Sequence, residues 1–70
     1  MSVVTAVVGR FDAAEGLGDL VLDDGRRIGF HATQLRDGSR RIEEGTCVVA
    51  RVVAGHAGKL EAVDITLLAR

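Results

Sequence analysis

The sequence predicts a small all-β domain built from five short strands, and three observations lead to that fold class. Runs rich in β-branched residues recur along the chain, turn-forming residues separate them about every 8 to 20 residues, and one turn is an Asp-Gly pair. The chain has 70 residues, of which 47% are hydrophobic. We therefore expect one folded domain over residues 1–70, neither a disordered tail nor a pair of domains.

The first half of the chain is predicted to form three strands. Val3–Phe11 is rich in β-branched residues, and the turn formers of Asp12–Gly16 separate it from a second run, Leu17–Leu22. The segment Asp23–Gly25 ends in Asp-Gly, which tolerates positive φ and so predicts a tight hairpin. Arg26–His31 is then the returning strand, with alternate residues facing the core and the outside.

The second half is predicted to add a long connection and two strands. Ala32–Glu44 breaks the strand rhythm and fits a connection with one helical turn, after which Cys47–Val53 forms a fourth strand. Gly55–Gly58 predicts a turn into a fifth strand within Lys59–Leu68. A helix is the alternative for this last run, because four of its residues approximate a helical stripe: Leu60, Val63, Leu67 and Leu68.

Three segments, Arg10–Asp12, Glu15–Leu20 and Ile28–Thr33, match the spacing of motifs in a known family. Further positions agree along the chain: Asp37 with Gly38, Ile42–Gly45, Gly55 with Gly58, and Glu61 with Ala62. With these residues, nearly the whole chain resembles the cold-shock domain family, whose members bind single-stranded nucleic acid. The resemblance implies a small five-stranded antiparallel OB-fold barrel and a non-enzymatic function.

The main departure from that family is the scarcity of aromatic residues. Cold-shock domains stack bases on outward rings, each base contributing about 1–3 kcal/mol, whereas this chain holds only Phe11 and Phe30. Phe30 replaces an inward valine and is expected in the core, which leaves Phe11 and His31 as candidate stacking residues. Six positions that carry rings in the family carry other residues here: Arg10, Leu17, Asp19, Gly29, Ala32 and Ser39. The Asp19 carboxylate is also expected to repel phosphate.

The predicted function is weak, largely sequence-independent binding of single-stranded RNA or DNA, of a chaperone or regulatory type. The residues predicted to carry it are Arg10, Phe11, Leu17, His31, Arg36, Arg40, Arg41 and Lys59. The Arg10 guanidinium can stack on a base or pair with a phosphate. Phe11 fits a base contact and a packing role at the barrel rim equally well. The net charge of −1 gives no general attraction to nucleic acid.

Two further interpretations stay open. The arginines of the hairpin and of the long connection lie among acids, which favours a solvated surface whose charges pair with one another; those acids are Asp23, Asp24, Asp37, Glu43 and Glu44. Alternatively, Leu17, Gly29 and Ala32 form a smooth apolar patch that docks a protein partner or a second copy, as in a homodimer.

Catalytic, metal and cofactor sites are not predicted. The single Cys47 and the two histidines, His31 and His56, are too far apart in sequence for a paired metal-ligand motif. Glycines at 16 and 18 lack the further glycine of a dinucleotide-binding loop. No run approaches the roughly 20 apolar residues of a membrane span, and no secretory signal opens the chain. We therefore expect a cytoplasmic, non-enzymatic protein with no membrane partner.

Overall fold

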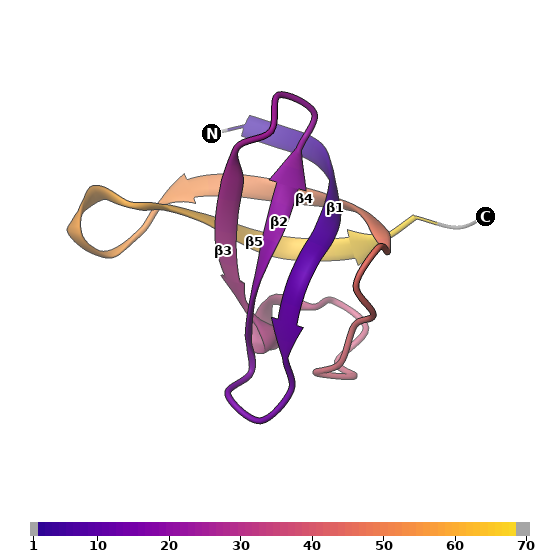
Figure 1. Ribbon diagram of the computed structural model, residues 1–70. Coiled ribbons are helices and arrows are strands. Elements are labelled where there is room, and N and C mark those ends of the chain that lie inside the picture. The colour runs from indigo at the N-terminus through magenta and orange to yellow at the C-terminus, as the bar shows by residue number, and fades with distance from the viewer. Residues whose placement is uncertain (1, 69–70) are drawn as a thin grey trace.

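Five strands close into a barrel in this computed structural model, which describes residues 2–68 (Figure 1). Around the barrel the strands follow the order β1-β2-β3-β5-β4. In Figure 1 the β1–β2–β3 sheet crosses in front of β4 and β5. The strands are β1 (Ser2–Asp12), β2 (Leu17–Leu22), β3 (Arg27–His31), β4 (Cys47–Ala54) and β5 (Leu60–Leu67). The predicted five-stranded β-barrel is confirmed, and the helical alternative for the last run is wrong.

One pairing departs from the expected antiparallel arrangement. Strands β3 and β5 run parallel, with Gly29 opposite Glu61 and Phe30 opposite Ala62, while the other four pairings are antiparallel. The reason is geometric: strand directions cannot alternate throughout a closed ring with an odd number of strands. At least one neighbouring pair must therefore be parallel, and here it is the short contact that closes the barrel.

The core is aliphatic and comes from the inward residues of every strand. Its most deeply buried side chains are Val8, Leu20, Val48 and Ile65, one each from β1, β2, β4 and β5. Phe30 is also buried, as expected from the sequence. No polar or charged residue of the described chain is buried, so burial of apolar surface is the main stabilising contribution.

The β2–β3 hairpin forms where the sequence predicts it. The N–H of Gly25 donates to the Leu22 carbonyl at 2.9 Å, and Gly25 alone in this turn takes a positive φ, of 89°. The Asp24 carboxylate accepts the backbone N–H of Arg26 at 3.0 Å and its guanidinium Nε at 2.7 Å. The backbone hydrogen bond from Arg26, followed by the side-chain contact, lowers the pKa of Asp24 below its ordinary value.

The long connection after β3 is anchored to the barrel at both ends. It begins with one 3₁₀ turn, η1 (Ala32–Gln34), which agrees with the predicted helical turn. Leu35 and Ile42 are buried, and the Arg36 N–H donates to the Ile65 carbonyl at 2.9 Å. A second 3₁₀ turn, η2 (His56–Gly58), joins β4 to β5. Within residues 2–68 there is no helix with the length and hydropathy to cross a bilayer.

Candidate nucleic-acid interface

The outer face of β1, β2 and β3 carries the residues that the sequence places at the binding site. Strand register puts Arg10 opposite Asp19, and Asp19 opposite Gly29, in one row across the three strands. The next row contains Leu17 opposite His31. Because side chains alternate along a strand and Leu20 is buried, Asp19 and Leu17 face outward.

A β-bulge in β1 sets the direction of Arg10 and Phe11. The register shifts between Val8 and Arg10, so Gly9 is an extra residue relative to β2. Strict alternation from the buried Val8 would turn Arg10 inward and Phe11 outward. The bulge reverses this, so that Arg10 is exposed and Phe11 is half-buried.

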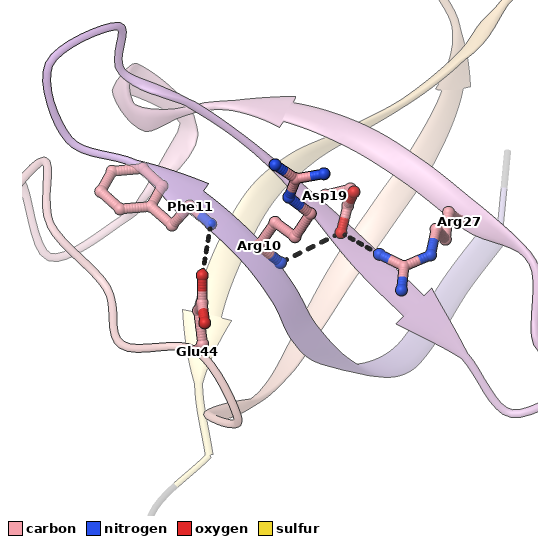
Figure 2. Close-up of polar contacts among 5 residues, drawn as sticks. All are labelled: Arg10, Phe11, Asp19, Arg27 and Glu44. Atoms are coloured by element: carbon pink, nitrogen blue, oxygen red, sulfur yellow. Dashed lines mark hydrogen bonds and ion pairs between the residues drawn. The ribbon is translucent and has the colours of Figure 1, made fainter.

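Asp19 holds this bulge in place (Figure 2). Its Oδ1 atom accepts the backbone N–H of Arg10 at 3.1 Å and the Nη1–H of Arg27 at 2.9 Å. A Cβ on Gly9 would lie 2.6 Å from the same oxygen, which explains why glycine occupies the bulge. On the other side of β1, the Phe11 N–H donates to Glu44 Oε2 at 3.4 Å.

Phe11 packs into the barrel end against Phe30. The two ring centroids are 6.0 Å apart and the ring planes are almost parallel, at 6°. The rings come from β1 and β3, and Gly18 lies between them on β2. Of the two interpretations left open for Phe11, this is the rim-packing arrangement, although the residue also lines part of the outer surface.

Two shallow grooves adjoin on the outer face, and together we call them the trough. One, of about 540 Å³, lies along β1 and β2, and the other, of about 610 Å³, lies over β3 and the β4–β5 turn. Both are lined by Leu17 and Gly18, so they meet at β2. Other trough residues include Arg10, Phe11, Asp19 and Glu44 on one side, and Gly29, His31, Lys59, Leu60 and Glu61 on the other.

His31 is oriented by the residue two positions after it. The backbone N–H of Thr33 donates to His31 Nδ1 at 3.2 Å, and the Thr33 hydroxyl lies 3.1 Å from the same nitrogen. Because Nδ1 accepts, the neutral ring carries its proton on Nε2. The exposed ring therefore presents a face for stacking and an N–H donor on the side away from η1.

The basic residues fall into two groups. Three arginines pair with acids: Arg26 with Asp24 at 2.7 Å, Arg27 with Asp19 at 2.9 Å, and Arg51 with Asp64. Five other cations make no ion pair with any residue in 2–68: Arg10, Arg36, Arg40, Arg41 and Lys59. Pairing with the expected acids is therefore right for Arg26, whereas Arg27 pairs with Asp19 on β2. It is wrong for the arginines of the long connection, which form no ion pair within residues 2–68.

The structure brings together five of the eight predicted site residues. Arg10, Phe11, Leu17, His31 and Lys59 line the trough. Arg41 lines a neighbouring groove that also includes Phe11, whereas neither Arg36 nor Arg40 lines the trough. The three arginines of the long connection therefore do not line the trough.

Comparison with known proteins identifies the fold. No family model and no curated protein matches the sequence. Among solved structures, Drosophila Unr CSD456 superposes with a TM-score of 0.81 and 26% sequence identity over 97% of this chain. The chain has a cold-shock-like fold. It spans 27% of the length of the Unr chain that it matches.

Three features of this site could not be read from the sequence. Glu44 reaches the backbone of β1 from 33 residues away, and Leu60 and Glu61 enter the trough only because β5 closes the barrel against β3. For Asp19 the sequence predicts only repulsion of phosphate, yet its carboxylate also holds the bulge. The one available signal was Gly9, a glycine inside a strand pattern, which is typical of a bulge.

Potential metal ligands and the single thiol add nothing to the trough. Within the described residues, no group of three or more His, Cys, Asp or Glu side chains is positioned to hold a metal ion. Cys47 is the first residue of β4, as expected, and its side chain is exposed.

Proposed function

We propose that this cold-shock-like domain binds single-stranded RNA or DNA in the trough, without catalysis. Binding is weak and largely independent of sequence, and its effect is to hold strands unpaired or to act in regulation. The observation that carries the proposal is an outward groove on the β1–β2–β3 face that is lined by Arg10 and Lys59, two of the five cations that pair with no acid in residues 2–68. A cytoplasmic setting, usual for cold-shock domains, is part of the proposal.

The expected weakness follows from what the trough lacks. An exposed aromatic ring contributes about 1–3 kcal/mol per stacked base, and here Leu17 and Gly29 stand at two such positions while Phe11 packs on Phe30. The remaining planar groups are the His31 imidazole and the Arg10 guanidinium, which also stacks on bases. Affinity must therefore come mainly from phosphate contacts made by the five cations.

A matched pair of arginine variants tests this proposal. We expect a labelled oligouridine or oligothymidine of about seven nucleotides, within the ~4–16 that one OB fold spans, to bind at low salt with shifts at His31 and Leu17 amides. Arg10→Ser should weaken binding and reduce the slope of log K against log salt by about 0.7 for each phosphate that the variant no longer neutralises. Arg26→Ser changes the formal charge equally but removes a cation already paired with Asp24, so binding should be nearly unchanged.

Two results would overturn the proposal. The first is the absence of any shift on the trough at millimolar oligonucleotide and low salt. The second is an equal effect of Arg10→Ser and Arg26→Ser, because binding would then follow net charge and not this face.

A protein-binding function is the second candidate, and one observation favours it. Leu17 and Leu60 are 49% and 46% exposed on the two sides of the groove that contains Gly29. Exposed aliphatic side chains around an open groove suit a protein partner or a homodimer. Analytical ultracentrifugation decides between the candidates: a tight dimer that Leu17→Ser dissociates, together with no oligonucleotide binding, would favour the protein-binding function.

A further inference from the structure

Asp19 presents one unused carboxylate oxygen to the trough. Its Oδ1 atom already accepts two hydrogen bonds, from the Arg10 backbone and from Arg27, whereas no residue in 2–68 donates to Oδ2. Figure 2 shows this second oxygen directed away from both donors. The side chain is 25% exposed, so Oδ2 can meet a ligand in the groove along β1 and β2.

The neighbours of Asp19 leave room for a flat group. Across β2, the residue opposite Asp19 on β3 is Gly29, and on β1 the bulge residue is Gly9. A Cβ on Gly29 would meet nothing closer than the Gly18 carbonyl oxygen, at 3.9 Å. On the β3 side the surface beside the carboxylate is therefore backbone, on which a base can lie with its edge toward Oδ2, while Arg10 and Arg27 border the carboxylate on the β1 side.

An ionised carboxylate only accepts hydrogen bonds, so it selects base edges that donate. The Watson–Crick edge of guanine places two donors side by side, N1–H and the N2 amino group. Cytosine and adenine each offer one amino group beside a ring-nitrogen acceptor. Uracil and thymine offer a single N3–H between two carbonyl oxygens, whose lone pairs face the carboxylate unfavourably.

We propose that Asp19 gives the trough a preference for guanine at one position and disfavours uracil and thymine there. This inference rests on the proposed function and adds a base preference to it at a single position, while the rest of the strand is bound through phosphates. We expect about a fivefold preference, the lower end for a base contact of about 1–3 kcal/mol, because the site is partly exposed and the carboxylate repels phosphate.

The test uses an oligouridine host in which one central nucleotide is changed. Fluorescence anisotropy with a 5′ label compares guanosine, cytidine, adenosine and uridine at that position. Wild-type protein should bind the guanosine strand about fivefold more tightly than the uridine strand. Asp19→Asn keeps an acceptor for the Arg10 N–H but places an amide donor at the Oδ2 position, so the preference should disappear or turn toward uridine.

Asp23→Asn is the matched control. Asp23 lies in the hairpin outside the trough, and the substitution changes the net charge by the same amount. It should tighten binding of all strands slightly and keep the guanosine preference. Equal affinity of wild-type protein for all four strands would overturn this inference while leaving the proposed function intact. Absence of binding to every strand would overturn both.

A second measurement needs no change to the protein and covers the case in which Asp19→Asn does not fold. Inosine lacks the N2 amino group, and 1-methylguanosine lacks the N1–H donor. Each should lose part of the guanosine preference with the wild-type protein. If 1-methylguanosine binds as tightly as guanosine, the carboxylate does not read the N1–H and N2 edge, and the inference is wrong.

Discussion

Gly18 and Gly29 are adjacent glycines on neighbouring strands, and alanine should have opposite consequences at the two positions. A Cβ at Gly18 would lie 2.5 Å from the Arg10 carbonyl oxygen and 2.8 Å from two ring carbons of Phe30. Real Cβ contacts are essentially never below 3.0 Å, so β1 or the Phe30 ring must move by about half an ångström. At Gly29 the Cβ would have the Gly18 carbonyl oxygen as its nearest neighbour, at 3.9 Å, which is an ordinary van der Waals distance.

The magnitude for Gly18→Ala comes from two effects. Overpacking a closely fitted site costs about 1–3 kcal/mol, and displacing the Phe30 ring weakens its stacking on Phe11, which is worth about 0.5–1.5 kcal/mol. We expect a loss of about 2–4 kcal/mol, or roughly 15–25 °C in Tm for a domain of this size. Gly29→Ala should be neutral or stabilise by up to about 1 kcal/mol, because alanine restricts the unfolded chain.

Urea and thermal unfolding of both variants, followed by far-UV circular dichroism, measures the difference. The two substitutions add the same methyl group to the same sheet, so each is the control for the other. Free energies of unfolding that agree to within about 0.5 kcal/mol would refute the packing of Phe30 over Gly18.

Two further predictions concern stability. Leu20→Ala, at a side chain with 0% exposure, should cost about 2–5 kcal/mol in urea unfolding, whereas Val3→Ala, at 68% exposure, should change stability by no more than about 0.5 kcal/mol. Hydrogen bonds from Arg26 lower the pKa of Asp24 in the folded state. The ionised Asp24 carboxylate therefore stabilises the fold at pH values above 3.8, the pKa of the unfolded chain, and this stabilisation is lost as the pH falls below that value. Asp24→Asn should therefore flatten part of the decline in stability on the acid side of that pH, and an unchanged decline would contradict this assignment.

Local patterns in the sequence predict most of the strands. The β2–β3 hairpin is specified by Asp24 and Gly25 and by the alternation that follows, and β2 has the predicted bounds of Leu17–Leu22. Such features depend on neighbouring residues, and turn chemistry fixes them. The barrel as a whole follows from the family resemblance, because strand spacing alone is compatible with both a barrel and a sandwich.

The site was harder to predict, because one extra residue changes which side chains face outward. The bulge at Gly9 exchanges the directions of Arg10 and Phe11, and period-two alternation does not reveal it. The ion pairs could not be predicted from the sequence either. Arg26 pairs with Asp24, and Arg27 pairs with Asp19. Arg40 and Arg41 are equally close to acids in sequence but form no ion pair within residues 2–68. Those outcomes depend on the paths of strands and loops in three dimensions.

The parallel contact between β3 and β5 is the narrowest joint in the ring, with two paired positions. The hairpins pair residues that are close in sequence, whereas this contact pairs Gly29 with Glu61. Forming it therefore costs more loop-closure entropy than forming a hairpin. The groove containing His31 and Lys59 spans that same joint. A molecule seated there touches both sides of it, so occupancy and ring closure are thermodynamically linked: amide protons along the joint should exchange more slowly as the groove fills.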